Sequence, residues 1–104
     1  MILNVMFYEK VYEKLRKVPK GRVVTYKELA RSLNSKAYRA VGSAMGKNPF
    51  APSVPCHRVV NSNGNLGNFS GKGGVKAKIK LLEEEGIKIK NNKIVDFEKV
   101  LFRF

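Results

Sequence analysis

The sequence holds little of the chemistry that covalent cross-links or metal sites need. It has one cysteine, one histidine and no tryptophan among 104 residues. A lone cysteine cannot close a disulfide within the chain, and one cysteine with one histidine falls short of the four ligands of a structural zinc site. We therefore expect no metal, and a single free thiol suits a reducing compartment.

Acidic residues are also scarce. Asp and Glu number 8 against 21 Lys and Arg, which gives a formal net charge of +13. Such a charge is typical of a protein that binds a polyanion, and nucleic acid is the partner that we favour. A generally basic proteome or an acidic protein partner is the alternative. The charge is spread along the whole chain, which argues against a basic membrane anchor.

Long hydrophobic runs are missing as well. No stretch approaches the ~20 apolar residues of a membrane-spanning helix, and the N-terminus lacks the basic region and apolar core of a secretion signal. We expect an intracellular, cytoplasmic protein with no membrane partner. The length and the 43% hydrophobic content suit a single globular domain over residues 1–104.

Apolar spacing predicts a mainly α protein with four helices, at about residues 5–17, 26–33, 36–45 and 75–85. The second and third helices are joined by a short turn, which is typical of a helix-turn-helix. Turn residues predict two hairpins, at 58–67 and 87–97, the first in the position of a wing. The expected fold is a winged-helix-like helix-turn-helix domain with one or two small β-hairpins.

Capping residues support these helix boundaries. Thr25 and Glu28 have the spacing of a capping box, in which each side chain bonds the other residue's amide. Ser35 is a candidate N-cap for the third helix, and Gly46 is a natural residue to follow its end.

Gly42 lies inside the third predicted helix, where glycine costs about 1 kcal/mol relative to alanine. Two features would explain it. Another molecule's surface could approach the backbone closely at this point, or the helix could pack tightly against another helix of the same protein.

Cys56 and His57 stand side by side behind a proline-spaced loop. Pro49, Pro52 and Pro55 fix three φ angles within seven residues, which makes the loop stiff. Cysteine is among the most buried residue types, so Cys56 could be an inert structural thiol. The stiff loop and the adjacent histidine favour a held nucleophile with a base beside it.

At this point the sequence resembles the O6-alkylguanine-DNA alkyltransferases, also called methylated-DNA–protein-cysteine methyltransferases, and in particular their C-terminal catalytic domain. The resemblance covers about residues 5–87. Its motifs are residues 25–30 (TYKELA), 39–45 (RAVGSAM), 48–49 (NP), 55–60 (PCHRVV), 67–71 (GNFSG) and 81–86 (LLEEEG).

The resemblance implies DNA repair by a single-turnover, or suicide, methyltransferase. The target is O6-alkylguanine in double-stranded DNA, which must leave the base stack before a protein atom can reach it. Cys56 would take the alkyl group and keep it, and His57 would draw off the thiol proton through a bound water. A glutamate would orient His57: aligning by Gly86 assigns Glu85, with Glu83 as the competitor. No cofactor is implied, and we expect a monomer.

The resemblance also implies roles for residues around Cys56. Arg39 would fill the space of the flipped base, Tyr26 would donate to guanine N3, and Asn48 would support the loop and the proton relay. In the family, the second helix of the helix-turn-helix lies in the minor groove. The residues implied to contact DNA or the base are Arg39, Ala40, Gly42, Ser43, Val59, Asn68 and Ser70.

The sequence departs from the family in two ways. Most members carry a further N-terminal domain of similar size, whereas this sequence begins almost at the catalytic domain, and Phe69 stands where many members have Tyr. Two other functions stay open. Alkyltransferase-like proteins bind lesions without transfer and replace the cysteine, typically with Trp; a plain winged-helix transcription factor would leave Cys56 inert.

Overall fold

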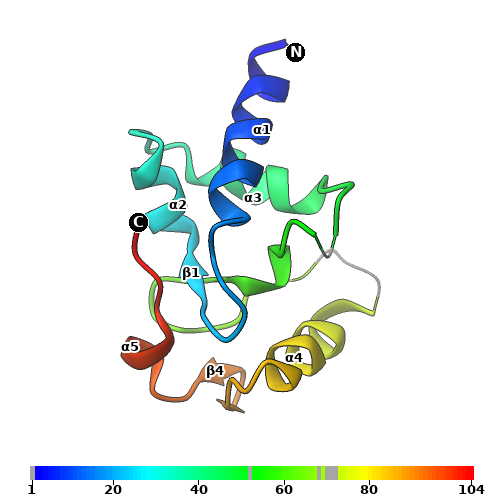
Figure 1. Cartoon of the computed structure of the whole chain (residues 1–104), viewed down its shortest axis with the longest axis vertical. Coiled ribbons are helices and arrows are strands. Elements are labelled where there is room, and N and C mark those ends of the chain that lie inside the picture. The colour runs from blue at the N-terminus through cyan, green and yellow to red at the C-terminus, as the bar shows by residue number, and fades with distance from the viewer. Residues whose placement is uncertain (1, 52, 68, 70–72) are drawn as a thin grey trace.

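Helices build most of the molecule, whose computed structural model describes residues 2–51, 53–67, 69 and 73–104 (Figure 1). The helices are α1 (Ile2–Leu15), α2 (Tyr26–Ser32), α3 (Tyr38–Gly46), α4 (Gly74–Glu84) and α5 (Phe97–Val100), with a 3₁₀ turn η1 at Cys56–Arg58. The strands are β1 (Val24–Thr25), β2 (Val59–Val60), β3 (Ile89–Lys90) and β4 (Lys93–Ile94). All four predicted helices are confirmed, with ends that differ by at most three residues.

Helices α1, α2 and α3 pack into one layer around a hydrophobic core. Val11 and Leu15 of α1, with Leu29 of α2, are fully buried there. The Tyr12 hydroxyl donates to the Ala44 carbonyl at 2.8 Å and so fixes α1 against α3. This layer holds α3 in place while its other side faces solvent. No helix among the described residues is long and apolar enough to cross a bilayer.

Only half of the predicted capping box forms at α2. The Glu28 amide donates to the Thr25 hydroxyl at 3.0 Å, as expected. The return bond is wrong, because the Glu28 carboxylate accepts instead from Arg31 and from the Phe104 amide. The sequence near Thr25 could not show that the distant C-terminal segment competes for this carboxylate.

The turn between α2 and α3 also differs from the prediction. Ser35 is not the N-cap of α3, because its amide closes α2 on the Ala30 carbonyl and its hydroxyl accepts from the Ala37 amide. Ala37 therefore precedes the helix, without a side-chain cap. Gly46 keeps a helical backbone as the last residue of α3, so it is not the residue beyond its end.

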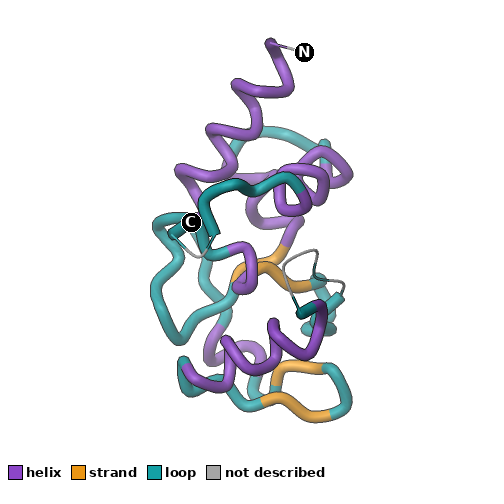
Figure 2. The backbone as a smooth tube through the Cα atoms, turned by 90° about the vertical axis from the view of Figure 1, so that its right-hand side faces the viewer, coloured by secondary structure: helices purple, strands orange, loops and turns teal. Residues whose placement is uncertain are grey.

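The strands form two separate pairs. β1 and β2 are parallel, with Val24 opposite Val59 and Thr25 opposite Val60. All four residues are buried, as parallel strands with two covered faces require. Figure 2 shows this pair between the layer of α1–α3 and helix α4.

The predicted hairpin at 58–67 is wrong, whereas the one at 87–97 is confirmed. The turn does close, with Asn61 donating to the Asn65 carbonyl at 2.9 Å. Asn65 then bridges to Lys93, so the segment after the turn pairs with the other hairpin. β1 takes the place beside β2 instead. The second hairpin forms as β3 and β4, with Ile89 opposite Ile94.

Candidate functional site

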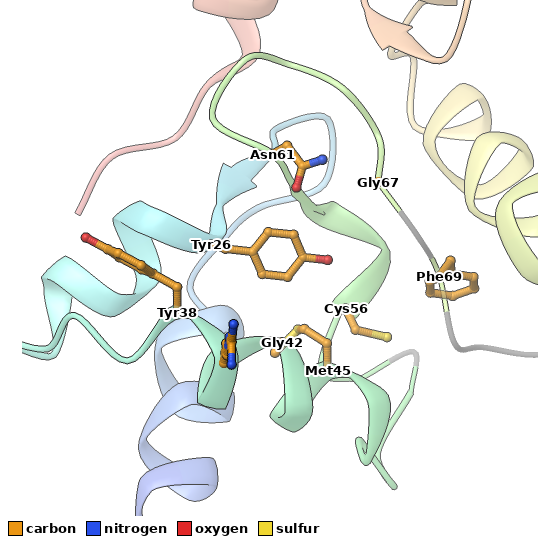
Figure 3. Close-up of a pocket in the computed structure, with 9 residues that line it drawn as sticks. Tyr26, Tyr38, Gly42, Met45, Cys56, Asn61, Gly67 and Phe69 are labelled. Atoms are coloured by element: carbon orange, nitrogen blue, oxygen red, sulfur yellow. The ribbon is translucent and has the colours of Figure 1, made fainter.

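A pocket of about 490 Å³ opens where the chain leaves the parallel strand pair. Tyr26 follows β1 directly, and Cys56 lies in the turn that leads into β2, so the pairing brings together residues that are 30 positions apart. Figure 3 shows the lining residues, which are Tyr26, Tyr38, Arg39, Gly42, Met45, Cys56, Asn61, Gly67 and Phe69.

Cys56 lies at the base of this pocket. Cys56 is buried, with only 8% of its surface exposed, yet it lines the cavity. Figure 3 shows the Tyr26 hydroxyl pointing toward the Cys56 side of the pocket. Burial, and after it the nearby Cys56, raise the pKa of Tyr26, so its hydroxyl keeps its proton and can donate. The thiol is sheltered and can be reached by a ligand that fills the pocket.

A buried ion cluster holds His57 in place. Its Nε2 lies 2.8 Å from Glu85 Oε2, and the Arg58 guanidinium donates twice to the same carboxylate, at 2.9 and 2.7 Å. Arg58 also donates to the Val18 carbonyl at 2.9 Å, which ties the cluster to the segment that follows α1. Of the two candidate glutamates, Glu85 contacts His57, while the Glu83 side chain is exposed.

The protonation states in this cluster follow from its geometry. Burial acts to raise the pKa of Glu85, but hydrogen bonds from Arg58 and His57 outweigh it and bring that pKa to about 2. Burial lowers the pKa of His57 despite Glu85, so the ring is neutral at neutral pH. An ionised carboxylate only accepts hydrogen bonds, so Nε2 carries the proton and Nδ1 remains as the basic nitrogen.

Lys78 is a part of the site that the sequence analysis missed. It is 1% exposed, and its ammonium donates to the carbonyls of Val59 and Leu66, both at 2.7 Å. Burial lowers its pKa to about 8, against a smaller opposing effect of Cys56. A lysine on the apolar stripe of the last predicted helix, between Val75 and Leu82, was the signal that could have revealed it.

The outer side of α3 borders the pocket. Val41 and Ala44 are buried, while Arg39 and Ser43 are exposed. A Cβ built on Gly42 would meet nothing within 4 Å. The alternative that Gly42 permits tight packing inside this protein is therefore wrong. Ala40, beside Arg39, is half-buried.

The remaining predicted site residues fall into three groups. Asn48 donates to the Val54 carbonyl and accepts from the Phe50 amide, both at 2.9 Å, so these bonds hold the loop that leads to Cys56. The Val59 carbonyl is already engaged by Lys78. Asn68 and Ser70 lie outside the described residues. In the part of the chain that the structure describes, no three His, Cys, Asp or Glu side chains gather into a metal-binding group.

The matching family and the similar proteins described below agree with one another. Residues 6–87 match the family described as 6-O-methylguanine DNA methyltransferase, DNA binding domain. A methylated-DNA–protein-cysteine methyltransferase of Thermococcus sibiricus is 52% identical over 83 residues, which are 79% of this chain and 45% of the relative. The chain spans about half the length of the curated relatives that it matches.

Solved structures show the same fold. The crystal structure of S. pombe Atl1 in complex with damaged DNA containing O6-carboxymethylguanine has a TM-score of 0.83 and 32% identity, and the match covers 95% of this chain and 96% of that one. The O6-methylguanine-DNA methyltransferase of Pyrococcus kodakaraensis has a TM-score of 0.70 and 49% identity, covering 78% of this chain and 46% of that one.

Proposed function

Because the chain belongs to the 6-O-methylguanine DNA methyltransferase family, we propose that it repairs O6-alkylguanine in duplex DNA by transferring the alkyl group to Cys56. The observation that carries this proposal is the placement of Cys56 at the base of an open pocket, beside a histidine held by a buried carboxylate. We propose further that residues 1–104 form one catalytic domain that works as an intracellular monomer on DNA.

The reaction is an in-line displacement at the alkyl carbon. The thiolate is the nucleophilic form of cysteine. His57 Nδ1 takes the proton of Cys56 through a bound water, while Glu85 holds Nε2 and stabilises the ring as it becomes charged. A sulfur–carbon bond forms as the bond from that carbon to guanine O6 breaks, and the electron pair passes to the guanine. A hydrogen bond from Tyr26 to guanine N3 makes the base a better leaving group.

The product explains why no cofactor is required. The alkyl group ends as a thioether on Cys56, and a thioether offers no ready leaving route, so each protein molecule acts once. Both the acceptor and the base belong to the chain itself. The stoichiometry is therefore one alkyl group per protein.

Helices α2 and α3 serve as the DNA-binding unit in this proposal, as a helix-turn-helix that lies in the minor groove. The outer side of α3 bears three small residues after Arg39, namely Ala40, Gly42 and Ser43. The open space above Gly42 supports this docking, because no group among the described residues occupies it. Arg39 enters the base stack when the lesion swings into the pocket. The net charge of +13 suits a phosphate backbone.

The segment beside the pocket has predicted roles that do not depend on side-chain type. The Val59 carbonyl, which also accepts from Lys78, accepts from the guanine amine in this proposal. By resemblance to the family, we assign a contact with guanine O6 to the Ser70 amide and a contact with DNA to Asn68. Asn48 supports the relay indirectly by fixing the loop through Val54.

Lesion binding without transfer is the second candidate. It is favoured by the match to Atl1 over nearly the whole of both chains. Cys56 in the pocket favours transfer, since a binder has no need of a sheltered thiol backed by His57 and Glu85.

Mass spectrometry after reaction with lesion DNA separates the two candidates. The protein is incubated with duplex DNA that carries isotope-labelled O6-methylguanine, then digested, and the peptide with Cys56 is weighed. We expect one labelled methyl group per protein, absent from Cys56→Ala. Tight binding with an unchanged mass would instead identify a lesion binder.

Arg39→Ala provides a control for base flipping. The substitution should slow repair of duplex DNA strongly but leave reaction with free O6-benzylguanine near its original rate, because only the duplex requires extrusion of the base. Equal losses with both substrates would contradict the role of Arg39.

A further inference from the structure

Tyr38 is an exposed aromatic residue at the edge of the reactive pocket. It is the first residue of α3, and 45% of it is open to solvent. Figure 3 shows its ring on the far side of Tyr26 from Cys56, next to α2. Tyrosine, with an apolar ring and a polar hydroxyl, is enriched at interfaces.

Two shallow depressions continue from the Cys56 pocket past this ring. The nearer one, of about 290 Å³, is shared by Tyr26, Lys27 and Tyr38. The farther one, of about 270 Å³, is shared by Lys27, Lys36 and Tyr38 and lies over the turn between α2 and α3. Because each depression shares lining residues with the next, the three adjoin one another around Tyr38, and we call this row of depressions the trough.

The outer end of this trough is positively charged. Lys27 and Lys36 are both exposed there. Arg31 lies between them, but Glu28 binds its guanidinium at 2.6 Å and offsets its charge. The two lysines are therefore the free positive charges that face the outer depression among the residues that line it.

We propose that this trough binds the nucleotide next to the flipped lesion, with its base or sugar stacked on Tyr38 and its phosphates on Lys27 and Lys36. The inference rests on the proposed function, because it places the strand that delivers the damaged base. A nucleotide rotated into the Cys56 pocket draws its neighbouring phosphates to the pocket mouth. Beside that mouth the trough offers a flat ring and, further out, two cations, the groups that bind single-stranded nucleic acid without regard to sequence.

The charge contribution is tested through the salt dependence of binding. Affinity for a duplex containing O6-methylguanine is measured from low to moderate salt in a Cys56→Ala background, which prevents transfer. Lys27→Ala combined with Lys36→Ala should flatten the slope of log affinity against log salt by about 1.8, or roughly 0.9 for each lost phosphate contact. The matched control is Lys88→Ala with Lys90→Ala, two exposed lysines of the distant hairpin region, which should leave the slope unchanged.

The position of the contacts is tested with uncharged phosphates. A methylphosphonate placed next to the lesion should weaken binding of the protein that keeps Lys27 and Lys36. The same replacement should add little further loss once both lysines are alanine, because the interacting pair is already broken. Additive losses would overturn the assignment of these phosphates to the trough.

The role of the ring is tested with two substitutions. Tyr38→Ala should weaken binding of the lesion duplex about 5- to 150-fold, the range of one lost stacking contact, whereas Tyr38→Phe should bind like the wild type. Unchanged duplex binding by Tyr38→Ala would overturn the stacking role.

These results also separate the inference from the function on which it rests. If the wild type transfers no methyl group but the lysine and tyrosine variants still lose affinity as described, the transfer chemistry is wrong and the trough stands. If the wild type transfers normally and the slope and affinity are unaffected, the trough is wrong and the transfer chemistry stands.

Discussion

Replacing Gly42 with alanine should make the protein more stable and at the same time lower its affinity for DNA. Gly42 is the fifth residue of the nine in α3, so it lies in the helix interior. There alanine is favoured over glycine by about 1 kcal/mol, and the added Cβ would meet nothing within 4 Å. No clash offsets the gain. For a domain of this size, 1 kcal/mol corresponds to a rise in Tm of about 4 °C.

The opposite sign is expected in the complex. If DNA lies directly against this side of α3, the new methyl group intrudes on a close-packed contact, which typically costs about 1–3 kcal/mol. Binding of lesion duplex should then weaken by about 5- to 150-fold, while reaction with free O6-benzylguanine stays close to wild type. Thermal unfolding followed by circular dichroism and a binding titration measure the two effects on the same sample.

Gly86→Ala is the matched control for stability. A Cβ on Gly86 would also meet nothing within 4 Å, but its φ is +89°, where L residues are strained. That variant should lose stability where Gly42→Ala gains it. A Gly42→Ala protein that is both more stable and equally able to bind duplex DNA would refute the placement of α3 against the groove.

Three further predictions concern the buried groups around the thiol. Glu85→Gln should slow methyl transfer about 100-fold or more, since the base loses its charged partner, whereas Glu83→Gln should be nearly silent in the same single-turnover assay. Burial lowers the pKa of His57 below its ordinary 6.5, so the loss of transfer rate on acidification should be centred below pH 6.5; a decline centred above 6.5 would contradict a neutral buried base. Lys78→Met should lower the free energy of unfolding by about 2 kcal/mol or more, because two buried carbonyls lose their donor. Urea denaturation measures this loss, and an unchanged midpoint would show that Lys78 does not hold the strand.

The helices could be predicted from the sequence because their determinants are local. The apolar stripe of α1 and the bond from Glu28 to Thr25 both depend on neighbouring residues. The partner of β2 could not be predicted in the same way. Val59 and Val60 are followed by a good turn sequence, which favours a hairpin, but burial of both strand faces required the distant β1 instead.

The candidate site shows a similar division. Cys56 and His57 stand out because each is the only residue of its type in the sequence. From the sequence, the glutamate that orients His57 could be narrowed only to Glu83 or Glu85. The choice between them depends on which side of the end of α4 faces His57. Lys78 was missed because its role is to donate hydrogen bonds to two carbonyls, and these carbonyls come together only in the folded chain.

The parallel strand pair has a consequence for how this architecture tolerates change. It holds the backbone just before Tyr26 beside the backbone just after the cysteine turn. The distance between hydroxyl and sulfur is therefore set locally by the two paired positions of these strands. The segment between the two strands, including the helix that we propose to lie in the minor groove, leaves the strand pair and returns to it. Insertions or deletions within this segment can change which DNA duplexes are bound. The relative positions of the reacting hydroxyl and sulfur then stay the same.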